Sequence, residues 1–136
     1  MKRIGIGLIA GALMLAAGTL VGFIFQSVIP SLKDEYLNPG LFRHWSDPLM
    51  SVYFAVPFVT GIILAWIWSM TKGIIKGNMP SEKGIYFGLI YWFTTIPGML
   101  MSYSSFPVSF ALVSSWSLSG LAEAICAGLV FSKMLK

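Results

Sequence analysis

The stretch IGIGLIAGALMLAAGTLVGFIFQSVI, which runs from Ile4 to Ile29, contains no charged residue. A helix needs about 20 apolar residues to cross the ~30 Å hydrocarbon core of a bilayer. In lipid, a segment must satisfy its own backbone hydrogen bonds, which favours a helix over an open strand. The stretch therefore predicts a membrane-spanning helix.

Three further long apolar runs follow, and none shows the polar–apolar alternation that is typical of barrel strands. Hydrophobic residues make up 57% of the chain and charged residues 10%, whereas a soluble domain carries about 25% charged residues. The expected fold is all-α, a single polytopic membrane four-helix bundle over residues 1–136. The expected spans are residues 4–29, 48–70, 84–103 and 106–131, and the expected outer loop is residues 30–47.

The first three residues, Met1 to Arg3, resemble the basic start of a signal peptide. Two features favour a permanent span instead. The apolar run is longer than the core of a signal peptide, and no soluble domain follows it. We therefore expect residues 4–29 to remain in the membrane.

The basic residues are distributed unevenly between the two sides of the expected bundle. Seven lie on the side of the two termini and only two lie in the outer loop. The positive-inside rule places the side richer in Lys and Arg in the cytoplasm. We therefore expect a multi-pass protein of the plasma (inner) membrane with both termini cytoplasmic. The seven are Lys2, Arg3, Lys72, Lys76, Lys83, Lys133 and Lys136, and the two are Lys33 and Arg43.

Local signals mark the loops. A short surface helix is expected over residues 32–37, because Asn38 and the residues after it are typical of a helix stop. Asp47 followed by Pro48 indicates a helix start, since aspartate accepts hydrogen bonds from free N–H groups and proline tolerates the first turn. The connection near residues 102–107 is so short that the third and fourth spans should form a tight antiparallel hairpin.

Small residues recur along the spans and would let helix backbones approach one another closely. The first span carries four glycines that fall within about 60° of one another on a helix, so they form one stripe. Pro57 and Pro97 lie inside spans, where each should bend its helix and free one backbone carbonyl. The expected packing residues are Gly7, Gly11, Gly18 and Gly22, then Gly61, Ala65, Gly84, Gly88, Gly120, Ala124 and Ala127.

Glu123 is the one charged residue within the fourth span. It lies eight to ten residues from the inner end of that span, which is ~12–15 Å at 1.5 Å per residue and close to the bilayer centre. A charge at that depth costs at least ~2.5 kcal/mol. A neutral, hydrogen-bonded Glu123 is therefore the expected state.

The partners expected for Glu123 come from counting inward along the other spans. This places Thr60 of the second span and Tyr91 to Thr95 of the third at the same depth, with no Lys or Arg among them. Tyr91 and either Thr94 or Thr95 are the expected hydrogen-bond partners.

Ser115, Ser119 and Glu123 are spaced by four and form a gently drifting line on one helix face. The line is compatible with a polar cleft that leads from the outer surface to the carboxyl. Alternatively, each serine bonds a carbonyl one turn back or a neighbouring helix. Glu123 is thus either a polar clamp between helices or the deep end of a solute or proton site.

Other chemistry is poorly supported. One cysteine, Cys126, rules out a disulfide within the chain, and a single histidine, His44, excludes the usual zinc clusters. The spacing of Asp34, Glu35 and His44 matches no metal motif, and nucleotide loops, nucleophile elbows and haem motifs are absent. No run of basic residues suggests nucleic acid as a partner. We expect no cofactor and no metal.

Two stretches, FRHWSDPLMSVYFAVPF at residues 42–58 and IPGMLMSYSSFPVSF at residues 96–110, resemble small four-span prokaryotic membrane proteins of uncharacterised function. The resemblance runs from the second span through the fourth. It implies an architecture and no activity, and it carries no site residues.

The function expected from these features is non-enzymatic. The protein would bind or move a small solute or a proton through a polar cleft around Glu123, in contact with membrane lipid. Because 136 residues enclose little volume, a transporter would need to be a homo-oligomer. The first alternative is an accessory or structural subunit of a larger membrane complex. The second, an intramembrane acid–base enzyme using Glu123 with Tyr91 or a serine, lacks a nucleophile–base pair.

Overall fold

The computed structural model describes residues 1–136 and contains five helices and no strands. Four of the helices are long and apolar enough, by length and composition, to cross a membrane. The predicted all-α fold with four such segments is therefore confirmed. The helices are α1 (Lys2–Val28), α2 (Ser31–Tyr36), α3 (Met50–Thr71), α4 (Pro80–Ser105) and α5 (Phe110–Met134).

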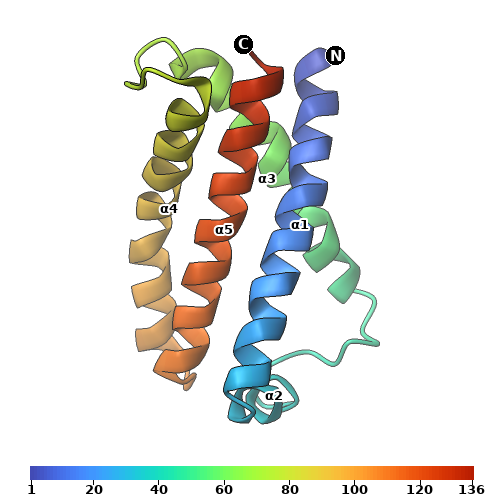
Figure 1. The fold of residues 1–136 in the computed structure, drawn as a ribbon. Helices are drawn as coiled ribbons and strands as arrows, with labels where there is room; N and C mark the ends of the chain where they lie inside the picture. The colour runs from blue at the N-terminus through green and yellow to red at the C-terminus, as the bar shows by residue number, and fades with distance from the viewer.

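The four long helices run along one another in the spatial order α4, α5, α1, α3 (Figure 1). Both chain termini lie at one end of the molecule, here called the terminal end, and α2 lies at the other, the α2 end. Helices α3 and α4 approach each other through side chains near the terminal end, where the ring centroids of Trp68 and Phe87 are 5.3 Å apart.

Two helices begin at positions that differ from those expected from hydropathy. Helix α4 starts at Pro80, four residues before the apolar run, because the Glu82 carboxylate accepts a hydrogen bond from the Asn78 N–H at 2.7 Å. Helix α5 starts at Phe110, where the Ser109 hydroxyl accepts one from the Leu112 N–H at 3.1 Å. Capping side chains, rather than the limits of the apolar runs, therefore determine where α4 and α5 begin.

The predicted start of the second span lies within two residues of the observed one. Helix α3 begins at Met50, and Asp47 Oδ1 accepts a hydrogen bond from the Leu49 N–H at 2.9 Å. That bond and the neighbouring Arg43 guanidinium hold the pKa of Asp47 below its usual value. The predicted short helix over residues 32–37 matches α2 to within one residue.

Two of the helix pairs approach closely where a glycine of one helix meets the backbone of the other. On α1, a Cβ added to Gly7 would lie 2.6 Å from Ile62 Cα, and one added to Gly11 would lie 2.6 Å from Phe58 Cα. On α4, a Cβ added to Gly88 would lie 2.7 Å from the Ala124 carbonyl oxygen. Small-residue packing is thus present at the α1–α3 and α4–α5 contacts.

The predicted single stripe on the first span divides between two partners. Gly7 and Gly11 meet α3, whereas Gly18 meets the side chain of Glu123 on α5. Gly22 and Gly120 have no atom within 4 Å of an added Cβ, so they make no comparable close contact. One face of α1 can contact two helices because α1 lies between α3 and α5.

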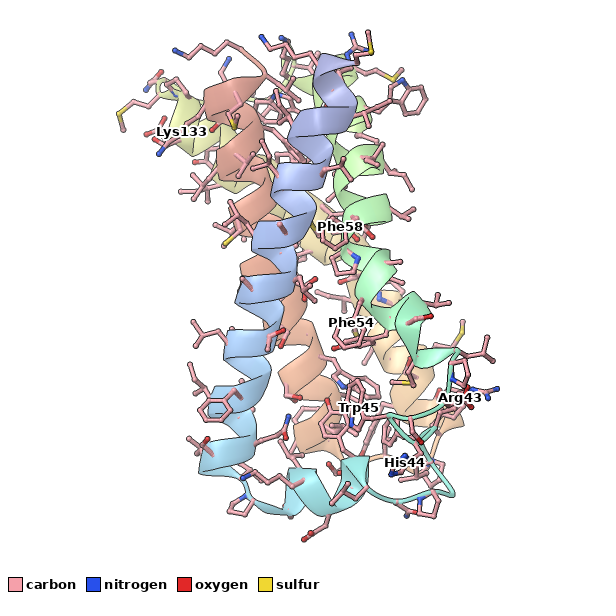
Figure 2. All side chains as sticks on the ribbon, turned by 90° about the vertical axis from the view of Figure 1, so that its right-hand side faces the viewer. Arg43, His44, Trp45, Phe54, Phe58 and Lys133 are labelled. Atoms are coloured by element: carbon pink, nitrogen blue, oxygen red, sulfur yellow. The ribbon has the colours of Figure 1, made fainter.

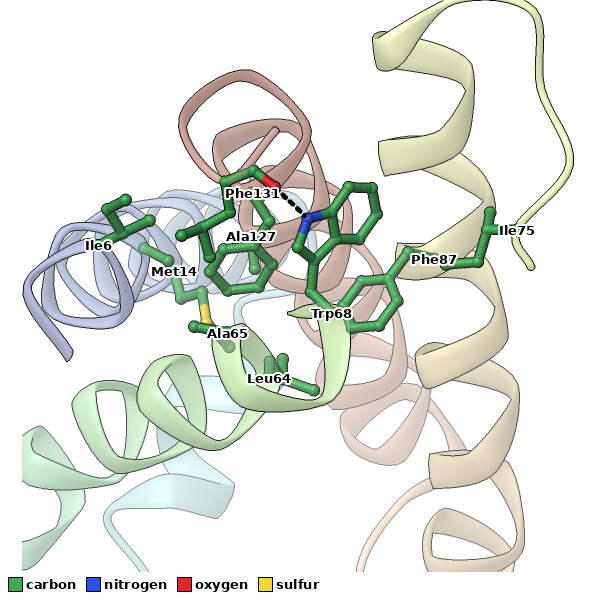
Figure 3. Close-up of a cluster of buried hydrophobic side chains, with 11 residues drawn as sticks. Ile6, Met14, Leu64, Ala65, Trp68, Ile75, Phe87, Ala127 and Phe131 are labelled. Carbon is green, nitrogen blue, oxygen red and sulfur yellow. Dashed lines mark hydrogen bonds between the residues drawn. The ribbon is translucent and has the colours of Figure 1, made fainter. Parts of the chain in front are cut away.

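Two apolar clusters form the core. The larger one, at the terminal end, surrounds Trp68 and Phe131, and the Trp68 indole N–H donates to the Leu135 carbonyl at 3.1 Å (Figure 3). The smaller one, at the α2 end, surrounds Leu32 and Leu112. There the Glu35 carboxylate accepts hydrogen bonds from the N–H and the hydroxyl of Ser109, the cap of α5, at 2.6 and 2.7 Å.

The half of α3 nearest the α2 end makes little contact with the rest of the molecule. Every residue from Ser51 to Val56 is exposed, and α3 leans away from α1 between Phe58 and Phe54 (Figure 2). Tyr53 and Phe54 pack instead against Trp45 of the preceding loop, with ring centroids 5.7 and 6.3 Å from the indole. The bundle is therefore closed at the terminal end and splayed toward the α2 end.

Candidate functional site

Glu123 lies about midway along α5, and its carboxyl group rests against the backbone of Gly18 on α1. Any side chain at position 18 would overlap with the carboxyl, because a Cβ there would come within 2.9 Å of Glu123 Cδ and closer still to Oε1. Glycine is thus the residue that makes room for the acid at this crossing. Helix α1 thus contributes the bare backbone at Gly18, and α5 contributes the carboxyl of Glu123.

The Glu123 carboxyl group is half-buried but receives no hydrogen bond from the protein. Every fully buried polar side-chain atom in the structure does have a hydrogen-bond partner. The Glu123 oxygens must therefore retain an accessible surface. An acid in this setting can donate or accept a hydrogen bond, or exchange a proton, with a group that comes from outside the chain.

Two tyrosines approach Glu123 from different helices. Tyr53 of α3 and Tyr91 of α4 both lie within the range of electrostatic interaction with the carboxyl, and neither is hydrogen bonded to it. Tyr91 is half-buried and packs on the larger core cluster, whereas Tyr53 lies on the exposed half of α3. The predicted hydrogen bond between Tyr91 and Glu123 is absent.

The serine line divides into two parts. Ser119 is half-buried one turn from Glu123, toward the α2 end, and makes no hydrogen bond, whereas the Ser115 hydroxyl donates to the Leu112 carbonyl at 2.7 Å. Ser115 is also fully buried and lies beside the phenol of Tyr36. The expectation that Ser115 belongs to the Glu123 site is wrong, because its own helix and the α2 end enclose it. Ser119 remains a candidate.

Thr94 and Thr95, which were predicted as partners, form no hydrogen bond with Glu123. The Thr94 hydroxyl donates to the Tyr91 carbonyl at 2.6 Å, and the Thr95 hydroxyl donates to the Trp92 carbonyl at 2.7 Å. A threonine hydroxyl can always reach a carbonyl one turn back in its own helix, so local bonds win over distant ones. Thr94 is exposed as well.

Thr60 lies at a different depth from the carboxyl. Its neighbour Gly61 packs on Gly7 and Gly11 of α1, whereas the carboxyl of Glu123 meets Gly18. The seven residues from Gly11 to Gly18 correspond to ~10 Å of helix. Thr60 is thus nearer the terminal end than the Glu123 carboxyl. The prediction counted residues along separate helices, and such a count ignores the tilt of α3 against α1.

Sequence reasoning did not assign Gly18 or Tyr53 to this site. A signal for Gly18 exists, because it belongs to the small-residue stripe of the first span, where a neighbouring helix can approach closely. Tyr53 carries no such signal, because its position depends on how α3 leans.

The polar residues of the loop before α3 have local roles. His44 Nδ1 lies 2.7 Å from the Ser46 hydroxyl, and Arg43 forms an ion pair with Asp47 at 2.9 Å. Together with the bonds from Glu35 to the α5 cap, these contacts stabilise the connection from α2 to α3. Because these loop residues have local partners, we do not include them in the candidate site. The candidate site consists of Glu123, Gly18, Ser119, Tyr53 and Tyr91.

Comparisons of the chain with models of known protein families, with curated proteins and with solved structures find no match.

Proposed function

We propose that the protein is a multi-pass protein of the inner membrane, crossed by α1, α3, α4 and α5, with the terminal end in the cytoplasm. The charge distribution supports this orientation. The terminal end carries seven basic residues and one acidic residue, Glu82, whereas the α2 end carries two basic and three acidic residues. Short cytoplasmic loops are enriched in Lys and Arg in this way.

Reporter fusions test the orientation. A reporter that is active only in the cytoplasm should give a signal when fused after Lys136 and when inserted between Lys72 and Lys76, because both sites belong to the basic end. The same reporter inserted between Asn38 and Arg43 should be silent. A silent fusion at either basic site, or a signal from the loop at the α2 end, would contradict the proposed topology.

We propose further that Glu123 binds or passes a small solute or a proton and that the protein is not an enzyme. The accessible and unpaired carboxyl near the middle of α5 carries this proposal. An intramembrane acid is expensive and is therefore a functional candidate by default.

Labelling with an apolar carbodiimide tests whether the acid is accessible. This reagent enters membranes and attaches to protonated carboxyl groups, so one adduct should form on Glu123 and its yield should fall as the pH rises. Glu123→Gln should abolish that adduct, and the matched variant Glu82→Gln should retain it. Peptide mass spectrometry identifies the residue that carries the adduct. A protein that remains unlabelled at Glu123 across the acidic range would show that the carboxyl is sealed.

The alternative role as a subunit of a membrane complex has its own support. Residues 51–56 of α3 are exposed and mostly apolar, and two of them, Tyr53 and Phe54, form an exposed aromatic group with Trp45. A second membrane protein or a second copy could pack on this surface. Purification from native membranes separates the proposals, because a subunit should elute with a stoichiometric partner, whereas a solute-binding protein need not.

A further inference from the structure

A pocket of about 280 Å³ opens at the terminal end, between the beginning of α1 and the ends of α3 and α5. Four of its six lining residues are basic and none is acidic. The two chain termini lie side by side at this end (Figure 1). The lining residues are Lys2, Arg3, Ser69, Lys72, Leu135 and Lys136.

The basic side chains of this pocket have no carboxylate side-chain partners. The ion pair between Arg43 and Asp47, at the opposite end, is the one salt bridge in the structure. Lys72 is held at the side of the pocket by its ammonium, which donates to the main-chain oxygens of Leu135 and Lys136 at 3.2 and 2.6 Å. An ammonium has three donors, so one remains for a ligand.

Helix α1 adds to the positive potential of the pocket. Its first turn contains Lys2 and Arg3 and no acidic residue, and no side chain caps its N–H groups. The start of a helix carries a partial positive charge, so basic residues there are unfavourable unless an anion is close. Two basic side chains and free N–H groups together match what a phosphate group requires.

We propose that this basic pocket binds the phosphate headgroup of an anionic lipid in the leaflet at the terminal end. Arg3 would hold phosphate oxygens through its guanidinium fork, and Lys2 and Lys72 would add point charges. Ile4 and Met70 adjoin the lining residues Arg3 and Ser69 in the sequence, and both are exposed apolar side chains that acyl chains could contact. Basic pockets between helix ends on the cytoplasmic side are a recurrent form of lipid headgroup site. The proposal depends on membrane insertion but not on Glu123.

The test measures retention of phosphatidylglycerol by the delipidated full-length protein in detergent, using native mass spectrometry and thermal stabilisation. Removing one cation should weaken binding about fivefold, so Lys2→Gln with Arg3→Gln should weaken it at least tenfold. This pair leaves the contacts of Lys72 to the chain intact. The matched control is Lys76→Gln with Lys133→Gln, which removes the same charge from exposed residues that do not line the pocket.

The expected result is strong retention of phosphatidylglycerol by the wild type and by the control pair, and loss in the Lys2 and Arg3 pair. Phosphatidylcholine should bind weakly to all three proteins. Equal loss in both pairs would overturn the proposal in favour of general surface charge. Displacement of the lipid by equimolar glycerol phosphate or inorganic phosphate would assign the pocket to a soluble phosphate compound instead. Neither result bears on the carbodiimide test of Glu123.

Discussion

Gly11→Leu is expected to separate α1 from α3 and to destabilise the folded protein by about 3 kcal/mol. A Cβ at position 11 would lie 2.6 Å from Phe58 Cα, 2.8 Å from the Pro57 carbonyl oxygen and 3.0 Å from Phe58 N. All three are backbone atoms, so no side-chain rotation can relieve the overlap. The midpoint of thermal unfolding in detergent should fall accordingly, and Gly11→Ala should show a smaller loss.

Gly5→Leu provides the matched control. Gly5 lies on the same helix, is exposed, and has no atom within 4 Å of an added Cβ, so leucine there should leave the midpoint nearly unchanged. The pair of variants separates a steric effect at the helix contact from the helix propensity of leucine, which both share. A stable Gly11→Leu protein would mean that α1 and α3 do not pack in the observed register.

Glu123→Leu is expected to leave stability unchanged or to raise it by up to about 2 kcal/mol. The reason is that the carboxyl receives no hydrogen bond from the protein, so its loss breaks none. Leucine is close in size and removes an acid from an apolar environment. Residues that serve function at the expense of stability commonly behave in this way. Thermal unfolding in detergent, with Glu123→Gln measured in parallel, provides the data.

The clamp interpretation predicts a different outcome for the same variants. If Glu123 held helices in register through hydrogen bonds, Glu123→Leu would strand its partners and reduce stability by about 1–3 kcal/mol. Glu123→Gln would retain most of the bonds and most of the stability. A loss of that size in the leucine variant, restored by glutamine, would therefore reject the solute or proton site in favour of a structural role.

The sequence predicted several individual contacts because each depends on one local rule. Gly61 packs on α1, and Gly84 and Gly88 pack on α5, because the absence of a side chain has the same consequence wherever two helices cross. The Asp47 carboxylate accepts a hydrogen bond from the Leu49 N–H in the turn just before α3, because such bonds involve residues that are close in sequence. The partners of Glu123 were not predicted correctly, since they depend on the tilt of three separate helices.

Thr60 and Ser115 show why the site could not be assembled from spacing alone. Thr60 matches Glu123 in residue count, yet α3 crosses α1 so that its contacts lie at Gly7 and Gly11 rather than at Gly18. Ser115 shares a helix face with Glu123, yet the α2 end encloses it beside Tyr36. Counting residues gives depth along a straight helix and carries no information about the direction in which neighbouring helices lean.

The sequence by itself determined that the chain forms four long apolar helices, because uninterrupted apolar runs of this length permit no other backbone structure in lipid. It also determined that one acid would lie within the last of them. Only the tertiary structure decided that Gly18 receives this acid and that Lys2, Arg3 and Lys72 meet in one pocket. Hydrophobicity acts on each segment separately, whereas these groupings follow from the angles and registers at which whole helices pack.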